Sequence, residues 1–165
     1  MRGDSRKPLT IQPATIDDVA LILGFIRGLA EYEKLSHEME ATEEQLREHL
    51  FGKRPVAEAL IARLNERAVG FALFFTNFST FAGKPGIWIE DIFILEQHRR
   101  QGIGRALIAA VARIAVERGY GAVEWTALDW NEPALRLYRK LGAVAMTEWT
   151  TQRLSGDALH KLADH

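Results

Sequence analysis

The sequence predicts an α/β (α+β) domain built around a mixed sheet, and three observations support this fold class. Strand-like segments occur before, between and after segments with helical periodicity, which is the order expected when helices pack on a sheet. The 165 residues are enough for one domain with a buried core. No internal repeat, low-complexity segment or interdomain linker is visible. We therefore expect one domain over residues 9–165, preceded by a tail of residues 1–8.

The N-terminal half is expected to form three strands and two helices. Each expected helix follows a Thr with an Asp or Gln three residues later, namely Thr15 with Asp18 and Thr42 with Gln45. This spacing is typical of a capping box, in which side chains satisfy free amides at the start of a helix. The expected elements are a strand over 9–14, helices over 19–35 and 43–51, and strands over 57–63 and 68–75.

The C-terminal half begins with an expected loop over residues 77–86, which contains Gly83, Pro85 and Gly86. A strand over 87–95 leads into a helix with apolar residues on one face, and Gly119 is expected to end that helix. The remaining expected elements are the helix itself over 102–118, a strand over 122–128, a helix over 132–142, one or two strands over 143–154 and a short helix over 156–164.

Composition excludes several classes of protein and site. The formal net charge of −1 argues against a nucleic-acid partner. The chain has no cysteine, which excludes disulfides, a thiolate nucleophile and cysteine-based metal sites. The 5 histidines show no metal-ligand spacing, so no metal is expected. The apolar runs are too short to cross a bilayer and the N-terminus does not resemble a signal peptide. We therefore expect a cytoplasmic protein with no membrane partner.

The junction between the strand at 87–95 and the next helix contains two closely spaced glycines, Gly102 and Gly104, among several arginines. A P-loop signature is absent, and a dinucleotide-binding fingerprint would require Gly or Ala where Leu107 stands. One remaining interpretation is a phosphate cradle, because a helix N-terminus presents free amides to an anion. The other is a glycine-rich turn that only starts a helix. The local residues leave these two open.

A wider pattern around this junction resembles a known family. The spacing Arg99-x-x-Gly102-x-Gly104 matches Gln/Arg-x-x-Gly-x-Gly/Ala, the acyl-coenzyme A signature of the GNAT family of N-acetyltransferases. Residues 88–108, residues 128–143 and the N-terminal segment are similar to the diamine branch, which contains spermidine/spermine and thialysine acetyltransferases. The resemblance covers roughly residues 9–162.

The resemblance implies a fold, a reaction and partners. The fold would have a mostly antiparallel central sheet flanked by helices. The reaction would be direct transfer, in a ternary complex, of acetyl from acetyl-coenzyme A to a primary amine of a small molecule such as a polyamine, thialysine or an amino-acid-like amine. A homodimer is expected, because the branch builds its substrate pocket between subunits. The alternatives are a protein or peptide N-acetyltransferase and a non-catalytic acyl-coenzyme A-binding module.

The resemblance also assigns residues to coenzyme A. Backbone amides of the arginine–glycine loop would bind the pyrophosphate, the preceding strand would pair with the pantetheine arm, and an Asn would hydrogen-bond that arm. The residues assigned in this way are Ile92, Phe93, Ile94, Arg99, Arg100, Gln101, Gly102, Ile103, Gly104, Arg105 and Asn131.

Two residues are assigned to catalysis, Tyr138 and Glu90. In the family the matching tyrosine is the proposed general acid, and a phenol with a pKa of about 10 can protonate a leaving thiolate whose thiol has a pKa of about 8.5. Asn131 and Tyr138 are two helical turns apart and would share one face. The family places its base-like glutamate at Glu90, and a carboxylate there can accept the proton of an ammonium group. On residues alone, Tyr138 could instead be a packed helix aromatic.

Five further residues are candidates for the amine substrate. Asp91 follows Glu90, but successive strand residues point to opposite faces, so both acids face one cleft only if a bulge intervenes. An exposed edge pair is the other interpretation of these two acids. The chain departs from the branch near residue 148, where Thr-Glu-Trp replaces the usual Glu-Gly-Trp, and this puts the substrate's identity in doubt. The candidates for the amine site are Tyr32, Glu33, Phe81, Asp91 and Glu148.

Overall fold

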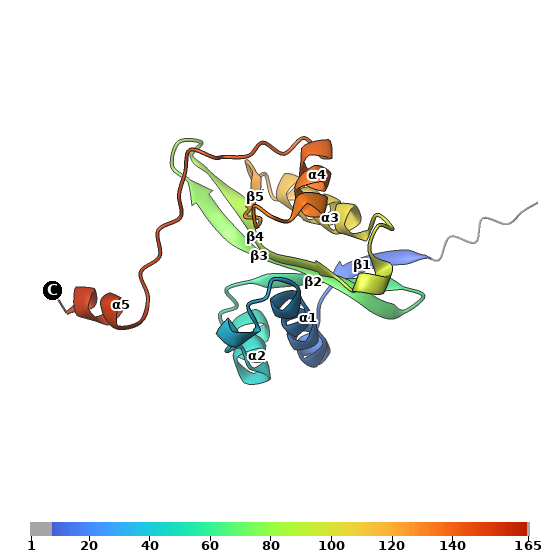
Figure 1. Cartoon of the computed structure of the whole chain (residues 1–165), viewed down its shortest axis with the longest axis horizontal. Helices are drawn as coiled ribbons and strands as arrows, with labels where there is room; N and C mark the ends of the chain where they lie inside the picture. Colours follow the sequence, from blue (N-terminus) through green and yellow to red (C-terminus); the bar gives the residue numbers. More distant parts are fainter. Residues whose placement is uncertain (1–7, 165) are drawn as a thin grey trace, which may run out of the picture. The chain divides into compact units, whose positions relative to one another are not determined.

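The computed structural model describes residues 8–164, and the chain divides into two compact units. The first ends at Leu128 and the second begins at Asp129. Apart from Pro8, the expected tail of residues 1–8 lies outside the described residues. The first unit contains the whole sheet and three helices, and the second contains two helices joined by irregular chain (Figure 1).

The sheet has five strands in the order β1-β2-β3-β4-β5. The first four strands pair antiparallel with their neighbours, and β5 pairs parallel to β4. This confirms the prediction of a mixed, mostly antiparallel sheet. The strands are β1 (Leu9–Pro13), β2 (Glu58–Leu64), β3 (Arg67–Ser79), β4 (Lys84–Ile94) and β5 (Val123–Trp125).

Helices cover both faces of the sheet, with α1 and α2 on one face and α3 on the other (Figure 1). Each face has its own apolar cluster. The α3 cluster includes Leu107 and Phe74, and the α1 cluster includes Phe25 and Phe71. The helical elements of the first unit are η1 (Ile16–Asp18), α1 (Val19–Tyr32), η2 (Ser36–Glu38), α2 (Glu43–Phe51), η3 (Glu96–His98) and α3 (Ile103–Glu117).

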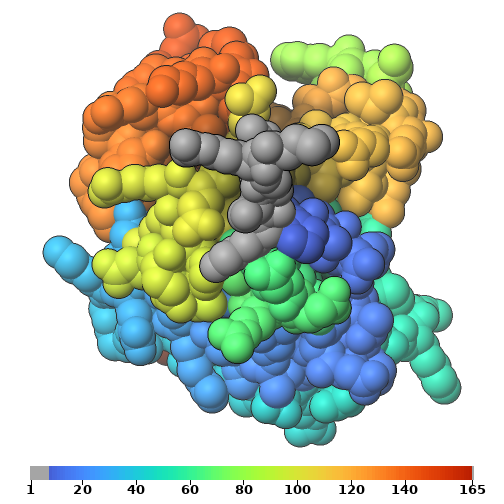
Figure 2. All heavy atoms as spheres, turned by 90° about the vertical axis from the view of Figure 1, so that its right-hand side faces the viewer, coloured from blue at the N-terminus to red at the C-terminus, as the bar shows by residue number. Residues whose placement is uncertain are grey.

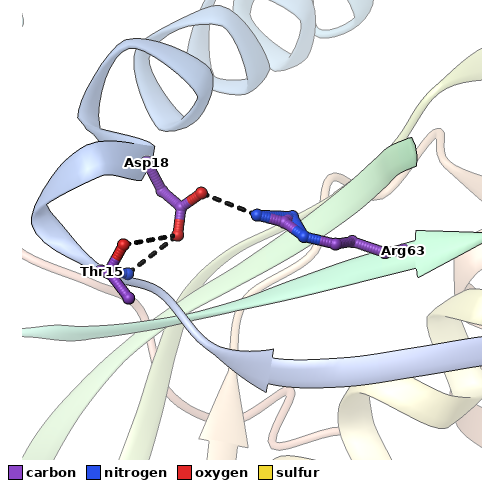
Figure 3. Close-up of polar contacts among 3 residues, drawn as sticks. All are labelled: Thr15, Asp18 and Arg63. Carbon is purple, nitrogen blue, oxygen red and sulfur yellow. Dashed lines mark hydrogen bonds and ion pairs between the residues drawn. The ribbon is translucent and has the colours of Figure 1, made fainter. Parts of the chain in front are cut away.

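The start of α1 is fastened to the sheet through Asp18 (Figure 3). The Thr15 amide donates to Oδ2 of Asp18 at 2.8 Å, and Nη2 of Arg63 on β2 donates to Oδ1 of the same carboxylate at 2.8 Å. Both side chains of this ion pair are largely buried, at 25% and 14% exposure. Hydrogen bonds to charged groups contribute about 1.5–3 kcal/mol. The carboxylate that caps the chain before α1 therefore also fixes where α1 begins on the sheet.

The second predicted capping box is also present. Thr42 donates its amide to Oε1 of Gln45 at 2.9 Å and accepts the Gln45 amide on Oγ1 at 3.3 Å. The helix that follows ends before Gly52, as predicted.

The predicted loop at 77–86 is mostly paired strand, which corrects that expectation. The hairpin connection occupies only residues 80–83, since β3 and β4 continue pairing up to it. Gly86 illustrates why the composition misled. A Cβ there would lie 2.7 Å from Oδ1 of Asn77 and 3.0 Å from the Ala122 carbonyl oxygen. The glycine permits close approach of neighbouring chain segments and does not mark a turn.

The second unit contains α4 (Glu132–Lys140) and α5 (Gly156–Ala163). The prediction of one or two strands over 143–154 is wrong, because no residue of that segment belongs to a strand. Its apolar positions are exposed, including Val144 at 81% and Met146 at 64%. Apolar spacing alone does not make a strand, because a strand also requires a neighbour to accept its backbone hydrogen bonds.

Candidate active site

The arginine–glycine loop follows β4 and η3 and leads directly into α3. Two of its residues have left-handed backbone, Arg100 with φ 61° and Gly102 with φ 79°, and Gly102 is the N-cap of α3. Left-handed turns beside a helix start can direct successive amides toward one anion. Arg100 and Arg105 are exposed, whereas Ile103 is buried, so Ile103 can offer an external ligand only its backbone.

The segment carrying this loop is anchored to β3, close to the turn that joins β3 to β2. The Leu95 amide donates to the Val69 carbonyl at 2.9 Å. Figure 2 shows the β2–β3 turn (green) beside the chain that follows β4 (yellow). A cavity of about 310 Å³ is lined by residues of both segments, including Arg67 and His98. The loop therefore starts from a fixed place at the end of the sheet.

The two acids of β4 lie at a β-bulge. Asp91 pairs with Leu73 and Ile89 pairs with Phe74, which leaves Glu90 as an extra residue without a partner on β3. Leu73 belongs to the α1 cluster, so its pairing directs Asp91 to the α1 face of the sheet. The bulge that both acids would need in order to face one cleft is therefore present.

Charge and burial make Asp91 a weak acid for its type. Burial, then the negative charges of Glu90 and Glu33, raise the pKa of Asp91 from 3.8 to about 6. Burial also raises the pKa of Glu33, which follows the last residue of α1. Three carboxyl groups from two elements therefore share one electrostatic environment, and a cation beside them would lower the free energy of their charged forms.

Trp88 is a neighbour of Glu90 that sequence reasoning missed. Its Nε1 donates to Oε2 of Glu90 at 3.1 Å. The signal was available, because residues two apart on a strand point to the same side. The indole hydrogen bond orients the Glu90 carboxylate.

The end of α1 brings Tyr32 and Glu33 to the same region as the loop. The helix ends at Tyr32, three residues earlier than predicted, because Lys34 adopts left-handed backbone with φ 61°. The guanidinium of Arg99 lies 4.5 Å from the centre of the Tyr32 ring. Two predicted sets of residues, one for coenzyme A and one for the amine, are thus in direct contact.

Asn131 and Tyr138 belong to the second unit. Asn131 is the N-cap of α4, and Tyr138 lies within that helix two turns later. Both side chains are half-buried and both have interaction partners. Glu132 at the start of the helix accepts a hydrogen bond from Nη2 of Arg139 at 2.6 Å. This exposed ion pair links two positions of the helix that are two turns apart.

Two predicted substrate residues are exposed, one in each unit. Phe81 lies in the β3–β4 turn with its side chain 99% exposed. Glu148 is exposed in the irregular segment of the second unit.

Comparison with known proteins decides the family. The sequence model of the acetyltransferase (GNAT) family matches residues 19–143. The chain belongs to this family. It is an N-acetyltransferase, and the match includes the arginine–glycine loop, both acids of β4 and all of α4.

Curated relatives resemble the chain over nearly its full length. A thialysine N-epsilon-acetyltransferase from Mus musculus is 37% identical over 164 residues, covering 93% of this chain and 96% of the relative. The L-ornithine N5-acetyltransferase NATA1 from Arabidopsis thaliana is 34% identical, covering 92% of this chain and 86% of the relative. The resemblance to the diamine acetyltransferase branch is thereby confirmed, and acetyl transfer to amines is its shared activity.

Solved structures agree with the fold. An integron cassette protein from the mobile metagenome of V. cholerae superposes with a TM-score of 0.78 at 25% identity, covering 95% of this chain and 98% of that one. An aminoglycoside acetyltransferase from an uncultured soil metagenomic sample superposes with a TM-score of 0.76 at 21% identity, covering 90% and 97%. Among residues 8–164, no helix is long and apolar enough to span a membrane.

Proposed function

We propose that the protein transfers acetyl from acetyl-coenzyme A to a primary amine of a small molecule that carries a second polar or cationic group, such as thialysine, ornithine or a polyamine. The observation that carries this proposal is the bulge of β4, which brings Glu90 and Asp91 together beside Glu33 of α1. Such a group of carboxyls suits an ammonium substrate, because the positive charge of the bound amine offsets the negative charges of the carboxylates.

The arginine–glycine loop fits the phosphates of coenzyme A. Its left-handed residues and the free amides at the start of α3 suit an anion, and the exposed Arg100 and Arg105 add positive charge. Open space surrounds Gly102, so no neighbouring side chain fills the position. The backbone of Ile92, Phe93 and Ile94 leads from the bulge to this loop and is the proposed path of the pantetheine arm. Bound acetyl-coenzyme A supplies the acyl group and a thiolate leaving group.

Glu90 is the proposed proton acceptor. An alkyl ammonium has a pKa near that of Lys, about 10.4, so only about one molecule in 10³ is the free nucleophile at neutral pH. Glu90, exposed at the bulge and oriented by Trp88, accepts the ammonium proton directly or through water. The nitrogen then forms its bond to the acyl carbon while the carbon–sulfur bond breaks.

Tyr138 is the proposed general acid, and Asn131 the proposed partner of the coenzyme arm. Both roles rest on the resemblance, and the family match supports them because it extends through α4. The Tyr138 hydroxyl would give its proton to the leaving sulfur. The acylated nitrogen would lose its second proton as the carbon–sulfur bond breaks, and that proton would restore the phenol through water. The net proton released is then the one that Glu90 takes. We also propose that both units belong to one catalytic domain over residues 9–165, because the family match crosses Leu128.

We propose that the active form is a cytoplasmic homodimer. The second unit exposes a set of large apolar side chains that a monomer leaves in water. A partner chain that covered them would gain about 25 cal/mol per Å² of apolar surface. They are Val144, Met146, Trp149, Leu154, Leu159 and Leu162. Phe81 and Glu148 are then the residues expected to face substrate across the subunit boundary.

The test is acetyl transfer to a panel of thialysine, ornithine, spermidine, free amino acids and lysine peptides. Release of the coenzyme A thiol measures the transfer. The chain has no cysteine, so the protein contributes no background thiol. Saturable transfer to small amines is expected. Saturable transfer only to peptides would favour the protein-acetyltransferase alternative and contradict the proposal. Coenzyme A binding without transfer to any acceptor would favour the binding-module alternative.

A matched pair of variants tests the proton acceptor. Glu90→Gln is expected to lower kcat/KM about 10²-fold at neutral pH, because a positioned base contributes about 10²–10⁴. Glu117→Gln, on the exposed end of α3, makes the same chemical change away from the acids and should leave activity unchanged. Equal activity of the two variants would remove Glu90 from the mechanism.

A further inference from the structure

The side chain of Arg99 turns away from the loop that carries it. Its Nε donates to the Ile94 carbonyl at 3.1 Å. Its guanidinium carbon lies 4.5 Å from the centre of the Tyr32 ring and 5.7 Å from the centre of the Phe93 ring. By contrast, Arg100 and Arg105 in the same loop are exposed. A cation held over aromatic faces is attracted by their electron density, and more strongly where water is partly excluded.

The rings under Arg99 continue into the core. Phe93 packs against Phe25 with ring centres 6.2 Å apart, and Phe25 stacks on Phe71 at 5.4 Å. Gly28 lets α1 approach this stack, since a Cβ there would lie 2.7 Å from the end of the Phe93 ring. Tyr32 follows Gly28 by one helical turn and so lies on the same face of α1. The end of α1 is therefore held by Arg99 on one side and by the aromatic core on the other.

We propose that Arg99 is a positioning residue for the amine: from within the phosphate-binding loop, its guanidinium holds Tyr32, and with it Glu33, in place against β4. The inference rests on the proposed function, since it assigns Tyr32 and Glu33 to the amine. It separates the two parts of one residue. The Arg99 backbone belongs to the loop for coenzyme A, whereas its side chain serves the acceptor.

The electrostatic effect of Glu33 on Asp91 supports this assignment. Glu33 directly follows Tyr32, and its charge raises the pKa of Asp91 on β4. The end of α1 and the bulge therefore interact electrostatically across the face where the amine would bind. Among residues 8–164 no described ion pair includes Glu33, and its amide donates to the Leu29 carbonyl of α1 at 2.9 Å. The stack of Arg99 on Tyr32 is the neighbouring contact that can fix its position.

The test is a double-mutant cycle between Arg99 and Tyr32, read in steady-state kinetics with the best amine of the panel. Arg99→Gln keeps a side-chain donor for the Ile94 carbonyl but removes the charge from the rings. It should raise the amine KM about tenfold and leave kcat and the acetyl-coenzyme A KM within about twofold, as loss of a partly desolvated cation–aromatic contact would. Arg99→Lys keeps the charge and should raise the amine KM less than Arg99→Gln.

Tyr32 variants separate the ring from its hydroxyl. In Tyr32→Phe the ring face remains, so Arg99→Gln should raise the amine KM by the same factor as in the native chain. In Tyr32→Leu the face is lost, and adding Arg99→Gln should change the amine KM less than twofold. Arg113→Gln, an exposed arginine on α3, is the matched control and should change neither KM.

Each outcome decides the inference. Independent, multiplying effects of Arg99→Gln and Tyr32→Leu would overturn it. So would an Arg99→Gln variant in which only the acetyl-coenzyme A KM rises, because the side chain would then serve the phosphates. Failure of the proposed function is distinguishable, since the native protein would then release thiol with no amine in the panel. If the native protein is active and Arg99→Gln leaves the amine KM unchanged, the role of Arg99 is contradicted and the proposed function is not.

Discussion

The two units of the molecule differ in how they are stabilised. Every buried apolar side chain among the described residues lies in the first unit, between Val19 and Ala115, on one face of the sheet or the other. The second unit has no buried residue in α4 or α5, yet it carries the proposed general acid. The proposed general acid therefore lies in the unit with less burial, where lower local stability is expected, whereas the loop and the acids lie in the unit that contains the core.

The largest expected effect tests this contrast with one substitution made in each unit. Leu107→Ala, at 0% exposure, should lower the free energy of unfolding by about 2–5 kcal/mol through a core cavity. Leu162→Ala, at 60% exposure, should change it by less than about 0.5 kcal/mol. Urea unfolding in dilute solution, where association contributes least, measures both. A comparable loss at Leu162 would mean that the second unit has a core after all.

The next effect separates chemistry from stability. Tyr138→Phe should lower kcat about 10²-fold, or about 2.7 kcal/mol, with little change in melting temperature. Tyr120→Phe in the first unit is the control, since that hydroxyl lies 3.3 Å from Oγ1 of Thr76. It should leave kcat unchanged and reduce stability by about 1 kcal/mol at most. Full activity of Tyr138→Phe would place the general acid elsewhere.

A smaller effect concerns association. Trp149 is 75% exposed in the second unit, and large aromatic residues often dominate interface energies. If a partner covers it, Trp149→Ser should weaken dimerisation about 30-fold, or about 2 kcal/mol, which sedimentation equilibrium would measure. Val56→Ser, at 67% exposure in the first unit, is the control. A monomeric native protein would contradict the dimer proposal and leave the exposed apolar side chains of the second unit unexplained.

The last effect is a pH dependence within the first unit. The folded pKa of Asp91 is about 6, above its ordinary value of 3.8. Between these values the folded state binds more protons than the unfolded state, so stability falls as pH rises from about 4 to about 6. Asp91→Asn removes this loss, which the two pKa values put at about 3 kcal/mol at most, and should be more stable than the native chain at pH 7.5 but not at pH 4. Unfolding curves at both pH values measure the difference, and an equal difference at both would contradict the raised pKa.

Local chemistry predicted much of the first unit. The two Thr-x-x-Asp/Gln spacings marked helix starts, and Gly52 marked a helix end, because caps depend only on residues within one turn. The position of the arginine–glycine loop was also predicted locally, because the left-handed backbone at Gly102 favours glycine.

Features that depend on distant residues were not predictable in the same way. The bulge at Glu90 is set by pairing with β3, and the position of Arg99 by rings from α1 and β4. The segment over 143–154 has the apolar residues of a strand but no neighbour in the sheet. In each case the local sequence pattern was visible, but the structure also depends on residues that are distant in the sequence.

The bulge has a consequence for insertions and deletions. In a regular strand, removing one residue turns every later side chain to the opposite face. In β4, Ile89 and Ile92 both pack in the α3 cluster although they are three residues apart. Deleting Glu90 would therefore restore strict alternation and leave both isoleucines where they are. A chain one residue shorter would keep these core contacts and lose the proposed proton acceptor, so the extra residue of β4 is not required by the packing of either isoleucine.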